Sequence, residues 1–186
     1  LQPIFIHALY LVNLASDKPD LLAKSHQALL TDLRNGDLIN SAGVIVHLGS
    51  HQGRGFDTVK DQIVDQIHTL LDQTKTTPFI IENSAGQNGK IGSLEEIKDL
   101  VEAINHPRLK VCLDSAHLFA AGWDLRQQAE VDQIVSQLIS HDLLDKLVCL
   151  HLNDSKAPVA SIRDIHENLG AVKIGLKGLA NFANHP

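Results

Sequence analysis

The sequence contains no methionine, two cysteines, one tryptophan and one tyrosine among its 186 residues. No apolar run approaches the roughly 18 to 20 residues that a membrane-spanning helix needs. The first residues show no basic segment leading into an apolar stretch, so they do not match the pattern of a signal peptide. Both cysteines, Cys112 and Cys149, lie in apolar runs, which favours reduced core residues of an intracellular, cytoplasmic protein over a disulfide framework. Because the sequence has no initiator methionine and opens directly on strand-like Ile4–Ile6, we expect an internal portion of a longer protein.

Glycine-rich phosphate loops are also missing. Neither G-x-G-x-x-G nor G-x-x-x-x-G-K-[ST] follows any predicted strand, which disfavours a dinucleotide-binding or P-loop fold. The net charge of −6 argues against a general nucleic-acid coat and against binding to an anionic membrane surface. A local phosphate site stays compatible with that charge, because bound metal ions supply positive charge that the sequence does not count.

Short apolar runs alternate with helical patterns along the chain. The predicted strands are Ile4–Ile6, Val44–Val46, Pro78–Ile81, Val111–Leu113 and Leu147–Leu150. Helices are predicted from Pro19, over Asp57–Gln73, from the capping box Ser93–Glu96, over Leu125–Ser140 and from Leu176, with a long polar loop over Asn153–Gly175.

Strands recur roughly every 35 residues with a helix between them, which predicts βα units and a parallel sheet. A doubly wound sheet and a (β/α)8 barrel both fit this α/β pattern, and no linker divides residues 1–186, so we expect one domain. Eight such units need about 250 residues. The five visible strands therefore suggest an incomplete barrel.

A potential metal ligand stands at the carboxyl end of every predicted strand. These residues are His7, His47, Glu82, Asp114 and His151. In a parallel barrel all these strand ends open on one face, where active sites are built. A capping aspartate or a core histidine explains any one of them, including the pair Asp114 and His117 taken alone, but not all five together.

Three further candidates follow the fourth and fifth strands. They are His117, Asp164 and His166, of which the last two alternate and can point the same way. Together with the strand-end residues they make eight nitrogen and oxygen ligands with no thiolate. Zinc takes about four ligands, so eight suit two or three ions, and clustered ions are a common device for phosphoester hydrolysis.

The other histidines are expected to have ordinary structural roles. His26, His68, His106, His141 and His185 fall on predicted helices or helix ends. His51 lies close to the predicted site, and the pattern leaves its role open.

Six stretches, in order over nearly the whole chain, resemble the endonuclease IV family, the zinc-dependent apurinic/apyrimidinic endonucleases of base excision repair. They are His7–Leu14, His47–Ser50, Ile81–Gln87, Asp114–Asp124, His151–Lys156 and Asp164–Gly170. The resemblance implies a TIM (β/α)8 barrel, here without its first two strands and its last strand. It also implies a trinuclear zinc site that cleaves double-stranded DNA 5′ to an abasic site, and we expect a monomer.

By motif match, the resemblance assigns every candidate to an ion. His7, His47 and Glu82 would hold the first ion, Glu82 with Asp114 and His151 the second, and His117, Asp164 and His166 the third. Glu82 would also orient or deprotonate the attacking water. Tyr10 and Leu11 match positions that press into bent DNA when the damaged nucleotide is flipped out, and Lys156 is expected to bind DNA.

The sequence departs from the family pattern at several positions. Ile165 stands where an arginine is common, Ala171-Val172 replaces Glu-Gly, Leu48 replaces a proline, and the family's last-strand glutamate lies outside this chain. The main alternative is a sugar isomerase or epimerase of the same barrel type, which uses a carboxylate-rich site for one or two ions. A non-enzymatic DNA-binding relative is a further alternative that the intact ligand set disfavours.

Overall fold

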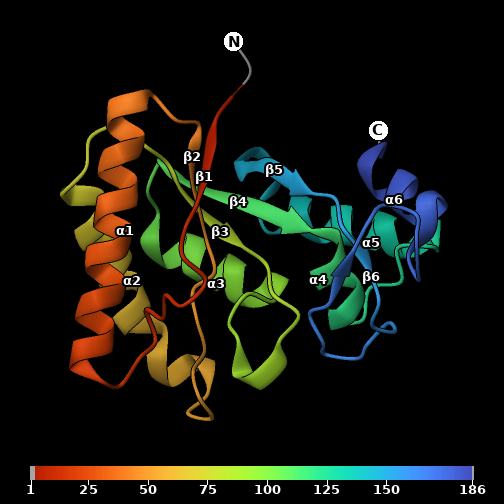
Figure 1. Cartoon of the computed structure of the whole chain (residues 1–186), viewed down its shortest axis with the longest axis horizontal. Helices are drawn as coiled ribbons and strands as arrows, with labels where there is room; N and C mark the ends of the chain where they lie inside the picture. The colour runs from red at the N-terminus through yellow and green to blue at the C-terminus, as the bar shows by residue number, and fades with distance from the viewer. Residues whose placement is uncertain (1–2, 186) are drawn as a thin grey trace. The chain divides into compact units, whose positions relative to one another are not determined.

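A computed structural model describes residues 3–185 (Figure 1). The chain divides into two compact units. The first unit runs to Glu82 and also contains residues 88–91 and 99–110. The second contains residues 83–87, 92–98 and 111 onward. Within the described residues, no helix combines the length and the apolar character needed to span a membrane.

The first unit is built on three parallel strands separated by two long helices. Its strands are β1 (Phe5–His7), β2 (Gly43–Val46) and β3 (Phe79–Glu82). Ile6 pairs with Val44 and His7 with Ile45, while Ile45 also pairs with Ile80. All side chains of β2 and β3 are buried, as expected for parallel strands covered on both faces.

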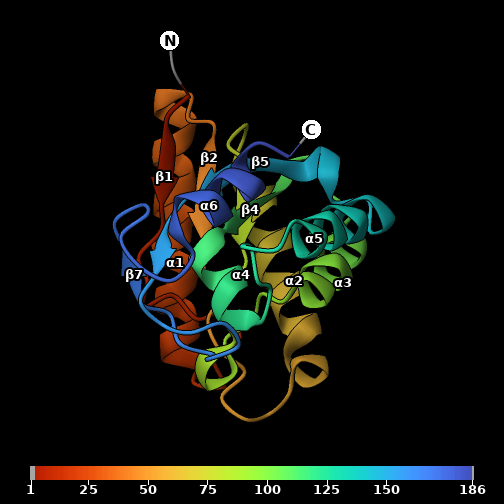
Figure 2. The same cartoon turned by 90° about the vertical axis from the view of Figure 1, so that its right-hand side faces the viewer.

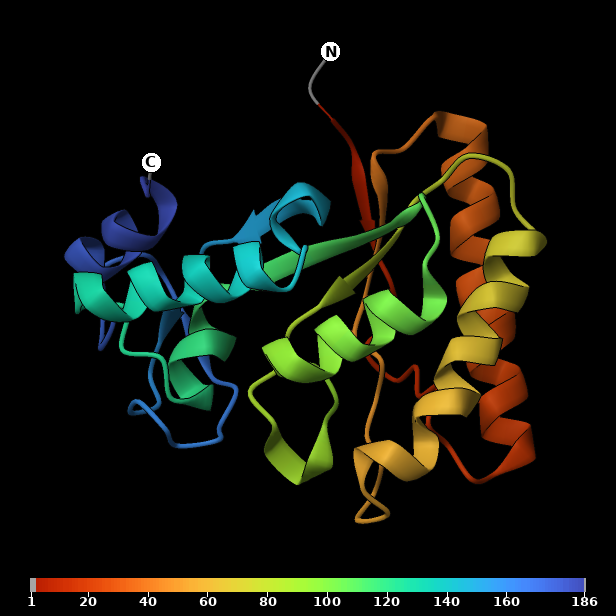
Figure 3. The same ribbon diagram turned by 180° about the vertical axis from the view of Figure 1, so that it is seen from behind.

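The helices of the first unit are α1 (Pro19–Ile39) and α2 (Phe56–Asp72). They lie side by side, as seen from behind in Figure 3. Pro19 occupies the first turn of α1, where its missing N–H is not needed, and Asn40 ends the helix in a left-handed conformation. The buried face of α2 consists of Val59, Ile63, Ile67, Leu70 and Leu71.

Three elements contribute residues to both units. These are α3 (Leu94–Ile104), β4 (Leu109–Asp114) and a 3-10 turn, η1 (Gln87–Gly89). The predicted capping box opens α3: Glu96 N–H donates to Ser93 Oγ at 3.2 Å and Ser93 N–H to Glu96 Oε2 at 2.9 Å.

The second unit follows β4 with a short helix, α4 (Ser115–Ala121), and then α5 (Gln128–Ser140), the turn η2 (Leu144–Lys146) and β5 (Leu147–His151). After β5 come a two-residue antiparallel pair, β6 (Asp154–Ser155) with β7 (His166–Glu167), and α6 (Gly175–Ala183). Figure 2 shows α5, which contacts α6. Strand β5 is parallel to β4, so both strands carry their ligand candidates at the same end.

The structure confirms the five predicted strands, adds one helix and corrects two other expectations. Helix α4, which was not predicted, begins directly after β4 and includes Ala120 and Ala121. Helix α5 begins at Gln128 rather than Leu125, because a turn at Asp124 and Arg126 precedes it. The loop expected over Asn153–Gly175 contains β6 and β7.

The expectation that both cysteines are core residues is confirmed for Cys112 and not for Cys149. Cys112 is fully buried, but Cys149 is only partly buried. Its neighbours Val148 and Leu150 are exposed, because in the described chain β5 packs as a strand with one open face.

Candidate metal centre

Two histidines from the first unit meet one buried carboxylate. His7 Nε2 lies 3.0 Å and His47 Nε2 3.5 Å from Glu82 Oε2. The two imidazole rings are 5.3 Å apart between centroids, and Glu82 is only 1% exposed. We call His7, His47 and Glu82 the first ligand group.

The backbone fixes the orientation of His7. Its Nδ1 lies 2.9 Å from the carbonyl oxygen of Ala8, which can only accept, so Nδ1 carries a proton. In the neutral form of this ring, the lone pair of Nε2 would therefore face Glu82. A carboxylate oxygen and an imidazole lone pair repel each other at this distance unless a proton or a cation lies between them.

The loop after β2 packs closely against the loop after β1. Asn13 Oδ1 accepts the backbone N–H groups of Ala15, at 2.9 Å, and Ser50, at 3.3 Å. Gly49 stands two residues after His47 with φ of 96°, and a Cβ there would lie 2.3 Å from Asn13 Oδ1. Glycine at this position thus permits the close approach that positions His47.

An aromatic and a cationic side chain flank the first ligand group. The Tyr10 ring contacts the His47 ring edge-on at 5.4 Å, and Lys90 Nζ lies 3.7 Å from the centre of the Tyr10 ring and donates to its hydroxyl. Tyr10 is 50% exposed and Leu11 81% exposed. Sequence reasoning missed Lys90, because nothing local connects it to a tyrosine 80 residues earlier.

Four side chains of the second unit form a second ligand group: Asp114, His117, Asp164 and His166. Asp164 Oδ1 lies 3.3 Å from His117 Nε2 and 3.0 Å from His166 Nε2. Asp114 Oδ1 lies 3.8 Å from both His117 Nδ1 and His166 Nε2. Ligand atoms of Asp114, His117 and His166 all lie within 4.8 Å of one another, a spacing that one metal ion can close.

The charges in the second ligand group are coupled. Burial opposes ionisation of Asp164, but hydrogen bonds from His117 and His166 outweigh it and hold the pKa of this carboxyl well below its usual range. The hydrogen bond to Asp164 raises the pKa of His166 against its partial burial, and the charge of Asp114 adds to the effect. Asp164 and Asp114 thus stabilise a positive charge at this position.

Two asparagines that the sequence analysis did not single out hold the second ligand group. Asn83 Oδ1 accepts the N–H of Asp114 at 2.6 Å, and Asn83 Nδ2 donates to the Asp114 carbonyl at 3.3 Å. The Asn83 carbonyl accepts from His117 Nδ1 at 2.9 Å, which turns Nε2 of that ring toward Asp164. Asn153 Nδ2 donates to Asp114 Oδ2 at 2.5 Å. Each asparagine directly follows or nearly follows a ligand candidate, which is the one signal that could have found them.

The loop that carries Asp164 and His166 is organised by a buried aspartate. Asp154 accepts backbone N–H groups from Ser155, Val172, Ile174 and Gly175 at 2.8 to 3.2 Å. Burial opposes its ionisation, yet these bonds lower the pKa of Asp154. Gln87 Oε1 accepts the N–H of Asp164 at 2.8 Å and fixes the far side of the loop.

His151 and Lys156 are the remaining predicted site residues of the second unit. His151 ends β5 opposite Asp114, and its carbonyl accepts from Ser115 Oγ at 3.2 Å. Lys156 Nζ pairs with Glu167 Oε2 at 2.7 Å, and that pairing lowers the pKa of Glu167. The predicted DNA contact of Lys156 would therefore compete with an existing ion pair.

Several other histidines have ordinary partners. His51 Nδ1 accepts from the N–H groups of Gly53 and Gly55, which makes it part of a turn. His26 contacts Gln66, His141 contacts Glu95 and His185 contacts Asp132.

Parallel βα units whose strand ends carry histidines and carboxylates define a metal-dependent enzyme of the α/β-barrel class. The family model described as a xylose isomerase-like TIM barrel matches residues 2–185. A curated relative named "Probable endonuclease 4" from Halothermothrix orenii is 36% identical over 189 residues, covering 100% of this chain and 68% of that protein. The chain belongs to the endonuclease IV family.

A solved structure agrees with this assignment. The crystal structure of endonuclease IV from Thermus thermophilus matches with a TM-score of 0.85 and 31% identity, covering 99% of this chain and 65% of that one. A D-tagatose 3-epimerase-like protein matches with a TM-score of 0.66 at 15% identity, which shows the shared fold alone. The chain thus spans about two thirds of the length of its relatives.

Proposed function

We propose that the protein is a zinc-dependent endonuclease that hydrolyses the phosphodiester 5′ to abasic sites in double-stranded DNA. The observation that carries this proposal is the pair of ligand groups, each combining imidazoles with a carboxylate in a chain of the endonuclease IV family. The names of the curated relatives support nuclease activity, and the substrate is our inference.

The side chains fit zinc. All eight candidate ligands offer nitrogen or oxygen, and five of them are histidines, a set that suits zinc better than calcium or magnesium. His7 and His117 each donate Nδ1–H to a backbone carbonyl, the contact that orients histidine ligands in metalloproteins. When bound, the ions supply activated water at neutral pH and compensate the negative charge of the phosphate.

The residues of the chain have separate roles in this proposal. Glu82 orients the attacking water and accepts its proton, because it is buried between two imidazoles that hold it in place. His117, Asp164 and His166 would hold a cation that would compensate the negative charge developing on the leaving 3′ oxygen. We also propose that Glu82, Asp114 and His151 would share a second ion, which would give three ions in total.

DNA contact is proposed for Tyr10, Leu11 and Lys90. An exposed apolar side chain and an aromatic ring suit insertion at a distorted base step, and the neighbouring ammonium group suits a backbone phosphate. Lys156 is proposed as a further phosphate contact. Its ammonium group would leave the ion pair with Glu167 and bind a DNA phosphate instead. We propose that the protein acts as a monomer.

A nicking assay tests this function. The protein that carries residues 1–186 is loaded with zinc and given a duplex with one tetrahydrofuran abasic analogue, beside the same duplex without it. We expect cleavage 5′ to the analogue only, loss of about 1000-fold or more in Glu82→Gln, and little change in Glu102→Gln on the exposed face of α3. An uncut analogue with zinc bound would contradict the proposal.

Metal content separates this function from the sugar isomerase alternative. Three zinc ions per protein and no turnover of keto sugars support the nuclease. One or two ions together with sugar epimerisation would support the alternative.

A further inference from the structure

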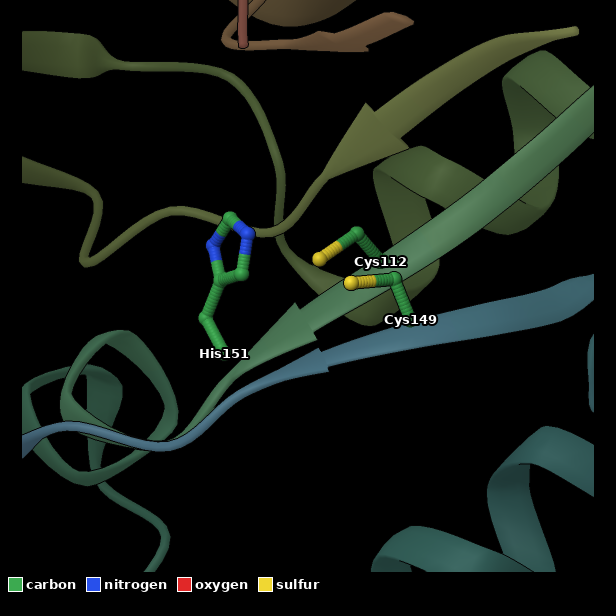
Figure 4. A group of neighbouring side chains, drawn as sticks. All are labelled: Cys112, Cys149 and His151. Carbon is green, nitrogen blue, oxygen red and sulfur yellow. The ribbon is translucent and has the colours of Figure 1, made fainter. Parts of the chain in front are cut away.

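The two cysteines of the chain lie opposite each other on neighbouring strands. Cys112 of β4 pairs with Cys149 of β5 in the parallel ladder, and both are reduced thiols. Figure 4 shows the two sulfur atoms side by side, with the ring of His151 on the side toward which both sulfurs point. The three ligand atoms lie within 4.8 Å of one another.

A shift in strand register creates this arrangement. Val111 pairs with Leu147, but the next residue, Cys112, pairs with Cys149, so Val148 is an extra residue on β5. Because side chains alternate between the faces of a strand, unshifted pairing would set Cys149 opposite Leu113, on the other face from Cys112. The extra residue therefore brings both thiols to one face, as bulges near functional sites often do.

The spacing and the accessibility suit a metal ion. Tetrahedral zinc with sulfur ligands places neighbouring ligand atoms about 3.8 Å apart, which the observed separations reach by small side-chain rotations. Cys112 is fully buried, while Cys149 and His151 are partly exposed. Two cysteines and a histidine leave a fourth position open.

We propose that Cys112, Cys149 and His151 form a binding site for a thiophilic d10 metal ion of the zinc and cadmium class. On binding, each thiol releases its proton to solvent and the thiolate forms a bond to the ion. No oxidant or reductant takes part. The site differs in chemistry from both ligand groups, which contain no thiol.

The site shares His151 with the proposed catalytic metal set. Cys149 lies two residues before His151, about 6.6 Å along the strand, so the thiols form a layer beneath the strand-end ligands. An ion held by the thiols takes the imidazole of His151 for itself. Only this competition for His151 rests on the proposed nuclease function. Cadmium binding is measured without DNA.

Cadmium titration tests the site in the presence of a phosphine reductant. Thiolate bonds to cadmium give an ultraviolet charge-transfer absorption that nitrogen and oxygen ligands do not give, and the chain has only these two thiols. We expect the absorption to saturate at one equivalent of cadmium and both thiols to become protected from a thiol-specific reagent. Cys149→Ser should weaken this binding by roughly 100-fold or more, as removal of one ligand from a site of three predicts.

Two histidine variants complete the test. His151→Gln should weaken cadmium binding strongly, whereas the matched control His141→Gln, at the end of α5, should leave it unchanged. Far-ultraviolet circular dichroism of each variant verifies folding. Absence of the charge-transfer absorption, or unchanged affinity in Cys149→Ser, overturns the site. Neither result bears on nicking of abasic DNA, so the two proposals fail separately.

Discussion

Asp114 Oδ1 accepts the backbone N–H of His117 at 2.9 Å, so the carboxylate caps the helix on which the histidine stands. Asp114 is therefore both the cap of α4 and a metal-ligand candidate, and His117, whose N–H it accepts, is the ligand candidate in the capped turn. The hydrogen bond fixes the first turn of α4 and with it the position of the His117 ring. One side chain serves both helix formation and the second ligand group.

The two roles of Asp114 are separable by mutation. Asn caps helices about as well as Asp, whereas Ala does not. We expect Asp114→Asn to lose zinc from the second ligand group while keeping most of the free energy of unfolding. Asp114→Ala should lose zinc and a further 1–2 kcal/mol, roughly, of stability. Urea denaturation and zinc analysis of the two variants measure the difference, and equal unfolding free energies would contradict the capping role.

Zinc affinity should rise with pH. His166 must be neutral to bind zinc, and its pKa is raised above the usual 6.5 by Asp164. Raising the pH through that elevated pKa removes the competing proton, so affinity should increase up to about tenfold per pH unit for this one proton. Isothermal titration from pH 6 to pH 8 in buffers of different ionisation enthalpy measures the proton release. His166→Gln should flatten the pH dependence, and a flat profile in the native chain would contradict it.

The metal-free chain should show the opposite trend in stability. His166, with its pKa raised on folding, stabilises the folded state at and below pH 6.5 and loses this contribution as pH rises through the elevated pKa. Asp164, with its pKa lowered, stabilises above pH 3.8 and loses its contribution as pH falls further. Stability from this pair should therefore be greatest between roughly pH 4 and 6.5. Chemical denaturation in the presence of a chelator checks this, with His166→Gln as the variant that removes the maximum.

DNA affinity should depend on Tyr10 and Lys90 in different ways. Lys90→Ala should weaken binding to all sequences and reduce the slope of log affinity against log salt by about one, because one phosphate contact is lost. Tyr10→Ala should weaken binding to abasic DNA more than to intact DNA, since the ring is proposed to act at the lesion. Lys60→Ala, which removes an ion pair with Asp99, is the matched control and should leave the slope unchanged. Fluorescence anisotropy at several salt concentrations measures all three variants.

Asn83 should be important for stability as well as for the metal. Asn83→Ala leaves the buried N–H and C=O groups of Asp114 without their side-chain partner, which should cost about 2–4 kcal/mol of unfolding free energy. Asn181→Ala removes weaker, more exposed bonds to the carbonyls of Leu125 and Arg126 and should cost under about 1 kcal/mol. Urea denaturation compares the two, and equal costs would contradict the role given to Asn83.

The strands and their ligand residues could be predicted because each depends on a few neighbouring residues. An apolar run followed by histidine or carboxylate is visible in the sequence, and the capping box of α3 is equally local. Helix α4 was missed because it is short and begins directly at Asp114, with no turn to separate it from the strand. Strands β6 and β7 were missed because they depend on Asp154, whose partners lie up to 21 residues away. Lys90 and Asn83 act through contacts with no sequence periodicity at all.

The extra residue at Val148 also has a consequence for comparing genomes. Deleting it would give an uninterrupted ladder in which Cys149 still pairs with Cys112 and His151 with Asp114. A relative with one residue fewer between Leu147 and the His-Leu-Asn-Asp stretch would therefore lose the bulge and keep the strand-end ligand on the same side. The length of this segment signals whether the bulge is present, and it can be read from sequence before any protein is made.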